Sequence, residues 1–269
     1  MFNLEIYASG LAVALLLAVA GWLLSIPRQD VTIVDSLWPA FFVVMTLVYI
    51  SLAPPLAFRA VILLFVVTVW ATRLSVSITL RNRGQPEDRR YQALRAEHEP
   101  GFRLKSLYLV FGMQATLAWI ISLPLLGALF GTEPLDWLDY AAVLLWLIGF
   151  GIETIADQQL AAFKADPANR NRVLDRGLWR YSRHPNYFGE FCIWWAFYLF
   201  ALSAGAWWSV IGPLLVTLLL LRIAGIRLLE QDIVERRPAY RDYTRRTNAF
   251  FPGPPRHPPS SPHQLGDLR

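Results

Sequence analysis

The sequence predicts an all-helical, polytopic integral membrane protein with seven transmembrane helices. The chain has 269 residues, is 55% hydrophobic and has a mean hydropathy of +0.37. Several of its apolar runs approach the roughly 20 residues that a helix needs to cross about 30 Å of hydrocarbon. Lysine and arginine are concentrated in alternate connections between these runs. Soluble domains of this length interrupt their apolar runs far more often.

Seven apolar runs mark the expected spans. They cover residues 4–26, 34–53, 57–80, 106–130, 138–158, 187–204 and 207–226. The first run follows no cationic segment and lacks a small-residue cleavage site, so we expect a retained helix rather than a removed signal peptide. The sole cysteine, Cys192, lies in the sixth run, where we expect a small, buried apolar side chain.

The distribution of cations predicts the orientation of the chain. Connections 81–105 and 159–186 and the segment after the seventh run are rich in arginine, whereas "APPLA", "GTEPLDWLD" and "SAGA" contain no lysine or arginine. The positive-inside rule therefore places the N-terminus outside and the C-terminus in the cytoplasm. This explains the net charge of +5 without a nucleic-acid partner.

We expect a single membrane domain, residues 1–251, followed by a disordered, proline-rich tail, residues 252–269. The outer connections are short. The cytoplasmic loops 81–105, 159–186 and 227–251 are long and polar, so a site that meets a soluble cofactor belongs there.

Ionisable residues inside the expected spans are candidates for function. They are Asp35, Arg73, Glu153, Asp157 and Glu190. Such groups are costly in a membrane and generally face a protein interior or a wet cavity. The alternative is that they pair with each other and lock helices together, for example Asp35 with Arg73.

Glu153 and Asp157 share one helix face, because they are four residues apart. Two like charges on one face repel each other, so they need a cation or several hydrogen-bond donors between them. Lys164, Arg170 and Arg172 follow in the next loop. These cations could bind phosphates, or they could serve only to keep the loop in the cytoplasm.

The stretch "GLWRYSRHPNYFGE", which begins at Gly177, carries the densest group of polar residues. The proline at 185 disfavours a helix before it, so we expect a new helix to begin near Pro185 or Asn186. Its free N–H groups suit a phosphate or carboxylate. We predict a cofactor pocket here at the cytoplasmic membrane face. An interfacial belt would explain Trp179 and Tyr181 but neither Asn186 nor Glu190.

The segment after the seventh run could close over this pocket. Its candidates are Tyr240, Tyr243, Arg245 and Arg246; the alternative is an interfacial amphipathic segment. The chain lacks a glycine-rich dinucleotide motif, and we interpret "GFGIE" at 149–153 as a helix-packing feature. Two of the four histidines lie in the expected tail, so we expect no metal centre.

Two families share a version of the arginine–histidine–proline–asparagine–tyrosine motif followed by Gly-Glu. One is the membrane steroid 5α-reductases with their related sterol reductases, and the other is the membrane methyltransferases that use S-adenosylmethionine. "RNRGQP" at 81–86, "ETIADQQ" at 153–159 and "DSLWP" at 35–39 resemble the reductases. The chain is similar to steroid 5α-reductases over most of its length, which implies a bacterial homologue in the inner membrane.

The resemblance implies an NADPH site. Its residues would be Asn82, Arg83, Glu153, Asp157, Lys164, Arg172, Tyr181, Arg183, His184, Asn186, Tyr187, Glu190, Glu230, Gln231, Tyr243 and Arg246. Asp35 stands in the place of the family's catalytic glutamate. The family's tyrosine is missing from the third span, which has Trp70 near that position. An indole N–H can donate a hydrogen bond but is a far poorer acid than a phenol. Asp35 would therefore act with Trp70 or with a tyrosine from elsewhere.

The expected activity is NADPH-dependent reduction of the C4–C5 double bond of a 3-oxo-Δ4-steroid-like enone taken from the bilayer. One alternative is an S-adenosylmethionine-dependent methyltransferase that acts on isoprenylcysteine or phospholipid. A second is a non-enzymatic lipid-binding or transport protein, which would bind no cofactor and would have a polar pathway open on both sides.

Overall fold

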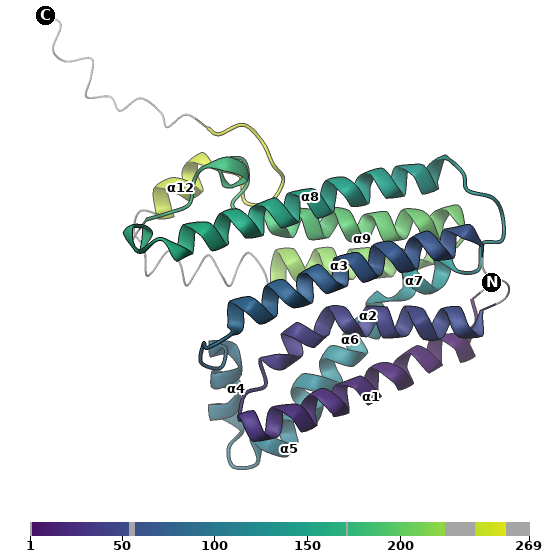
Figure 1. Ribbon diagram of the computed structural model, residues 1–269, viewed down its shortest axis with the longest axis horizontal. Coiled ribbons are helices and arrows are strands. Elements are labelled where there is room, and N and C mark those ends of the chain that lie inside the picture. Colours follow the sequence, from purple (N-terminus) through teal and green to yellow (C-terminus); the bar gives the residue numbers. More distant parts are fainter. Residues whose placement is uncertain (1, 54–56, 171, 224–239, 257–269) are drawn as a thin grey trace, which may run out of the picture. The chain divides into compact units, whose positions relative to one another are not determined.

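The computed structural model describes residues 2–53, 57–170, 172–223 and 240–256. Every regular element in these ranges is a helix and none is a strand (Figure 1), so the all-helical prediction is confirmed. Within the described residues, five helical segments are long and apolar enough to cross a membrane, one of them the composite segment Phe102–Ala128. The chain is therefore a multi-pass membrane protein.

The helices follow the apolar runs of the sequence. The longest are α1 (Leu4–Arg28), α2 (Ile33–Leu52), α3 (Phe58–Asn82), α8 (Trp137–Ala165) and α9 (Pro185–Ser203). The fourth run comprises α5 (Phe102–Ser106), the π-helix η1 (Leu107–Gly112), α6 (Met113–Ile121) and α7 (Leu123–Ala128). The remaining elements are α4 (Arg89–His98), η2 (Pro167–Asn169), η3 (Gly177–Arg180), η4 (Trp207–Val210), α10 (Ile211–Leu218), η5 (Leu219–Ile223) and α12 (Tyr240–Arg246).

The first five expected spans coincide with the five long apolar helical segments. The sixth run forms α9, which begins at Pro185 as predicted, and the seventh begins with the shorter apolar segment Trp207–Arg222. Neither is among the five. α9 contains Trp194, Trp195 and Tyr198, and the polar groups of such side chains make a helix less hydrophobic than leucine or valine would.

The chain forms two compact units. Unit 1 comprises Met1–Trp146 and Trp194–Val216, and unit 2 comprises Leu147–Ile193 and Thr217–Arg269. Helices α8 and α9 contribute residues to both.

Aromatic side chains from three helices form the centre of unit 1. Trp70 of α3 is fully buried, and its ring centroid lies 5.7 Å from that of Phe42 on α2. On α9, Trp194 and Phe197 lie 5.7 Å and 5.9 Å from Trp70. The contacts of Trp70 with Trp194 and Phe197 are edge-to-face, and such pairs are worth about 0.5–1.5 kcal/mol beyond the burial of their area. The cluster therefore joins α2, α3 and the second half of α9.

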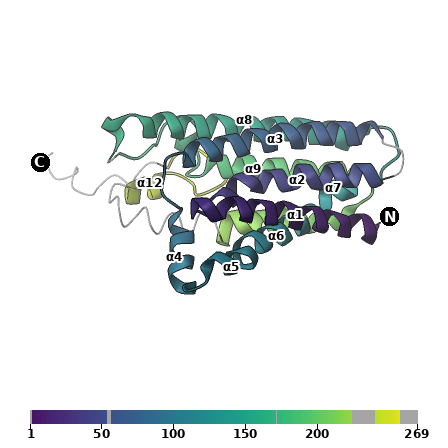
Figure 2. The same cartoon turned by 60° about the horizontal axis from the view of Figure 1, so that its bottom comes forward.

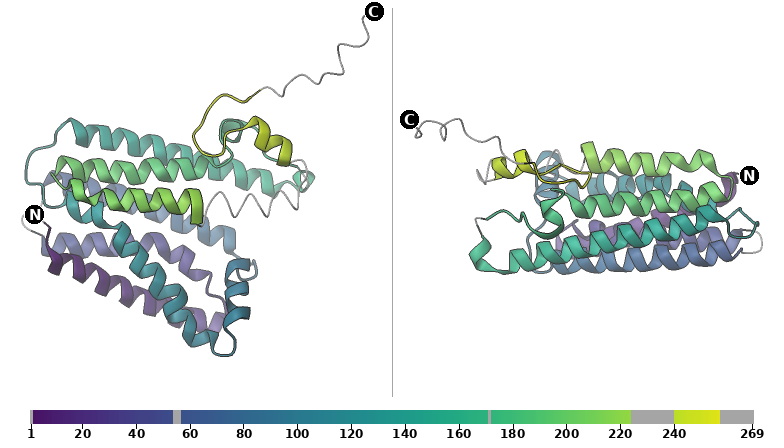
Figure 3. Two further views of the ribbon diagram at one scale, coloured as in Figure 1. Left: turned by 180° about the vertical axis from the view of Figure 1, so that it is seen from behind. Right: turned by 90° about the horizontal axis from the view of Figure 1, so that it is seen from above.

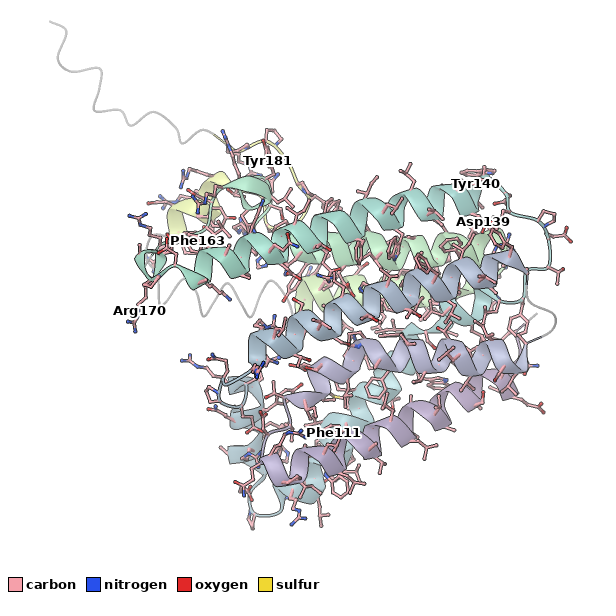
Figure 4. All side chains as sticks on the ribbon, in the orientation of Figure 1. Phe111, Asp139, Tyr140, Phe163, Arg170 and Tyr181 are labelled. Atoms are coloured by element: carbon pink, nitrogen blue, oxygen red, sulfur yellow. The ribbon has the colours of Figure 1, made fainter. Side chains whose placement is uncertain are left out.

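A buried ion pair ties together the ends of three helices in unit 1. The Arg59 guanidinium, on the first turn of α3, donates to both carboxylate oxygens of Asp139 at 2.7 Å and 2.8 Å. It also donates to Ser203 Oγ at the end of α9, at 2.8 Å. Figure 4 shows Asp139 at the N-terminal end of α8. Both charged side chains are only 1% exposed, so each depends on the other to offset its lost hydration.

Removing one partner of this pair should destabilise the protein strongly. We expect Asp139→Asn to cost about 3–5 kcal/mol, because it leaves the Arg59 charge buried and uncompensated. Replacing both residues, as Arg59→Met with Asp139→Leu, should restore most of the loss. The measurement is the melting temperature of detergent-purified protein. If Asp139→Asn has the melting temperature of the wild type, the ion pair does not stabilise the protein as proposed.

Candidate functional site

A cluster of polar side chains in unit 1 is centred on a carboxylate at the start of α2. Asp35 lies in the first turn of the helix, and its side chain is 16% exposed. Its Oδ1 atom accepts a hydrogen bond from Tyr91 Oη at 2.7 Å, and its Oδ2 atom accepts one from Arg90 Nη2 at 3.0 Å. Both donors come from α4, in the polar connection that follows the third span. The structure thus brings a phenol and a guanidinium to the predicted catalytic acid.

Hydrogen bonds fix helix α4 to the α1–α2 turn, and this gives Tyr91 its position. Figure 2 shows α4 near the end of α1. The Glu87 carboxylate accepts hydrogen bonds from Arg95 at 2.8 Å and 3.0 Å and from the Val31 N–H at 3.0 Å. Arg95 also donates to Gln29 O at 3.0 Å. These bonds span both ends of the turn, so α4 is held against the residues just before Asp35.

The N-terminus of α4 is capped by Asp88. Its Oδ1 atom accepts from the Arg90 N–H at 2.9 Å, and its own N–H donates to Thr32 Oγ1 at 3.0 Å. Burial acts to raise the pKa of Asp88, but the hydrogen bonds from Arg90 outweigh it and lower the pKa. The charged cap therefore stabilises the helix that carries both donors.

The environment of Tyr91 keeps its phenol protonated. The side chain is buried, which raises its pKa, and the charge of Asp35 and its hydrogen bond to the phenol raise the pKa further. A protonated phenol beside a carboxylate can donate a hydrogen bond to an oxygen atom. Because a raised pKa makes the phenol a weaker acid, this pair suits a hydrogen bond to a carbonyl oxygen rather than full proton transfer to it.

Tyr91 is the residue that the sequence interpretation missed. The expected partner was Trp70 or a tyrosine from elsewhere, and the structure places Trp70 in the aromatic cluster of unit 1 with Phe42, Trp194 and Phe197. One signal was available. Tyr91 is the sole tyrosine, phenylalanine or tryptophan in the polar connection from Arg83 to Gly101. The Asn82 and Arg83 candidates also lie in unit 1, at the C-terminal end of α3.

The second polar group lies in unit 2, where α8 meets the start of α9. Asn186 Nδ2 donates to Asp157 Oδ1 at 3.2 Å, so these two predicted cofactor residues are in contact. The rings of His184 and Tyr187 stack with centroids 5.5 Å apart. Glu153 is 4% exposed, one turn before Asp157 on α8.

Two glycines allow α8 and α9 to approach closely. A Cβ atom at Gly149 would lie 2.7 Å from Gly189 O, and one at Gly189 would lie 2.6 Å from Gly149 O. The Gly189 position would also meet the Glu153 backbone at 2.7 Å. The predicted packing role of "GFGIE" is therefore confirmed at Gly149, and this contact positions the acids of α8 beside the first turns of α9.

The connection between the two helices folds back on α8. Trp179 Nε1 donates to Ala156 O at 3.1 Å, and the Leu178 N–H donates to Gln159 Oε1 at 3.0 Å. Trp179 and Leu174 are buried in one apolar cluster with Phe163, which lies on α8. This anchoring sets the path of the chain that leads to Ser182, His184 and Asn186.

The residues after Tyr240 pack against this connection (Figure 3). Arg183 is 9% exposed, and its guanidinium donates to the backbone oxygens of Thr244 and Thr247. Tyr243 Oη donates to Trp179 O. Arg183 and Tyr243, both predicted to bind the cofactor, thus hold the C-terminal segment in place.

The other predicted cofactor residues differ in exposure. Lys164, Arg172 and Tyr181 are exposed, and Arg246 lies 3.5 Å from Asp175. Figure 4 shows Tyr181 and Arg170 on the polar segments of unit 2. Glu190 is half-buried in the second turn of α9. Glu230 and Gln231 lie outside the described residues.

Comparison with known proteins gives a family match over most of the chain. Residues 21–247 match the model of a protein family of unknown function, DUF1295, which includes steroid 5α-reductase-like membrane proteins. An uncharacterized protein of the fission yeast Schizosaccharomyces pombe is 26% identical over 287 aligned positions, which cover 93% of this chain and 81% of the yeast protein. No solved structure matches.

The close approach of α8 and α9 predicts different effects at two neighbouring glycines. Gly149→Ala should cost about 1–3 kcal/mol, because the added carbon overlaps Gly189 O. Gly151→Ala is the matched control, since a Cβ atom there meets nothing within 4 Å. Melting temperatures in detergent would separate the two variants. Equal melting temperatures would contradict the backbone contact.

Proposed function

The chain belongs to the DUF1295 family, and we propose that it is a membrane oxidoreductase that uses NADPH to reduce the C4–C5 double bond of a 3-oxo-Δ4-steroid-like enone. The observation that carries the proposal is the 2.7 Å hydrogen bond from the Tyr91 phenol to Asp35. A non-enzymatic lipid-binding protein has no need of a protonated phenol held on a carboxylate.

In the proposed reaction Tyr91 acts on the carbonyl oxygen of the enone. Its O–H changes acceptor from Asp35 Oδ1 to that oxygen and stabilises the negative charge that develops there when the β-carbon is reduced. Arg90 stays on Asp35 Oδ2 and keeps the carboxylate beside the phenol. A proton from water then bonds to the α-carbon, so one hydride and one proton are consumed. A positioned donor of this kind is worth about 2.7–4 kcal/mol in the barrier.

NADPH, when bound, supplies the hydride. The donor set of unit 2 fits an anionic dinucleotide, because Lys164 in the last turn of α8 and Arg170 and Arg172 on the connection after it are exposed cations. The amide of Asn186 and the carboxylate of Asp157 suit ribose hydroxyls or the nicotinamide amide. Arg183 and Tyr243 act in this scheme by positioning, since they fix the segment that carries His184 and Asn186.

The proposed topology has seven spans, with α9 and the segment that begins at Trp207 as the sixth and seventh. The N-terminus lies outside and the C-terminus in the cytoplasm of a bacterial inner membrane, as the arginine-rich connections indicate. The enone enters from the bilayer and the dinucleotide from the cytoplasm.

Ligand-dependent melting tests the cofactor assignment. We expect NADPH to stabilise the detergent-purified protein more than NADH does, because a ligand of the folded state adds about 2.7 kcal/mol at a hundredfold excess over its Kd. S-adenosylmethionine should give no shift. Stabilisation by S-adenosylmethionine alone would identify a methyltransferase, and the reductase proposal would be wrong.

Substitution of the phenol tests the acid. Tyr91→Phe should lower kcat for a 3-oxo-Δ4-steroid by about 10²–10³-fold, because it removes one donor to the developing oxyanion. NADPH should still shift its melting temperature. The control is Tyr108→Phe, which removes a hydroxyl from an exposed side chain on η1. Full turnover by Tyr91→Phe, or by an Asp35→Ala protein that still binds NADPH, would contradict the mechanism.

A further inference from the structure

Four phenylalanines form a corner between the start of α9 and the C-terminal segment in unit 2. Phe250 lies with its ring centroid 5.9 Å from Phe188 and 5.6 Å from Phe191. Phe251 lies 6.0 Å and 5.9 Å from the same two rings. Phe250 is 5% exposed, whereas Phe251 is 61% exposed. The corner therefore has a buried base and an apolar tip that the protein leaves uncovered.

Backbone hydrogen bonds fix this corner to the connection before α9. Ser182 Oγ donates to Phe250 O at 2.8 Å, and the Gly253 N–H donates to Tyr181 O at 3.0 Å. Tyr181 is 45% exposed. The exposed rings of Phe251 and Tyr181 thus belong to two segments that are joined by hydrogen bonds. Their positions depend on the fold of unit 2 rather than on loose loops.

Exposed arginines flank these rings in the sequence. Arg180, Arg241, Arg245, Arg246 and Arg256 are exposed. The Arg256 N–H donates to Arg246 O at 2.8 Å, which brings the end of the segment back to α12. The exposed acids in contact with these arginines are Asp242, 3.8 Å from Arg245, and Asp175, 3.5 Å from Arg246. The surface carries more positive than negative charge.

We infer that this surface, formed by Tyr181, Phe251 and the exposed arginines of residues 180 and 241–256, binds the anionic interface of the bilayer. An exposed aromatic tip is unfavourable in water but favourable at the boundary between headgroups and acyl chains. Each arginine near an anionic leaflet adds electrostatic attraction to it. The site requires no enzymatic activity.

The apolar surface is continuous with a helix, which favours lipid over a soluble partner. Phe188 and Phe191 lie on the first two turns of α9, the proposed sixth span, and both are half-buried. The tip therefore adjoins apolar side chains at the start of a proposed membrane helix. Phe250 and Gly253 are hydrogen-bonded to Ser182 and Tyr181. Binding of the tip to lipid would therefore also hold the connection that carries His184 and Asn186 at the membrane surface.

A spin label at position 251 tests this inference. The label is attached to Phe251→Cys in a Cys192→Ala background, since Cys192 is the sole cysteine and is buried. The control label is at Asp242→Cys on α12, where the side chain is 75% exposed. In nanodiscs of phosphatidylglycerol, collisions with oxygen and with a water-soluble nickel chelate are compared. We expect the label at 251 to collide more often with oxygen than with the nickel chelate. The label at 242 should show the opposite preference.

Equal nickel access at 251 and 242 would overturn the inference, because it would place Phe251 in water. A second label at Tyr181→Cys guards against a local effect of the first substitution and should show the same shift toward oxygen. In phosphatidylcholine nanodiscs the shift at 251 should be smaller. A shift that is independent of lipid charge would overturn the role of the arginines.

Discussion

A charged side chain placed among apolar helices needs a partner that offsets its lost hydration, and this constraint organises unit 1. Arg59 and Asp139 meet it by pairing with each other at the ends of α3 and α8, together with Ser203 of α9. Asp35 meets it differently, because its partners come from a polar connection rather than from another span. In the first arrangement both side chains are only 1% exposed, which is typical of a pair that holds helices together. The second contains a protonated phenol, which is capable of chemistry.

Unit 2 shows that polar residues in one motif can serve two purposes. Asp157 and Asn186 meet at the junction of α8 and α9, where the glycine contact brings the two helices together. Arg183 and Tyr243 instead bond to backbone oxygens and hold the C-terminal segment against the connection. A guanidinium bonded to two carbonyl oxygens of one segment contributes rigidity to its surroundings. The motif thus combines side chains suited to a ligand with side chains that fix its shape.

The C-terminal segment links the two proposals made for unit 2. It is bonded to the connection before α9 and carries the exposed ring of Phe251. Lipid binding at that ring would hold the same connection at the membrane surface. A cofactor that arrives from the cytoplasm and an enone that arrives from the bilayer would then need no large movement of this connection.

The sequence alone determined the all-helical membrane class, the first five spans and the start of α9 at Pro185, because hydrophobic run length and the steric effect of proline are local properties. It also identified Asp35 as an unusual acid and Gly149 as a packing position. It did not identify Tyr91 or the Arg59–Asp139 pair. Tyr91 is 56 residues from Asp35 and Asp139 is 80 residues from Arg59, and only the tertiary structure decides which distant side chains meet. The roles of Arg183 and Tyr243 have the same origin, since their acceptors are backbone oxygens that no residue type encodes.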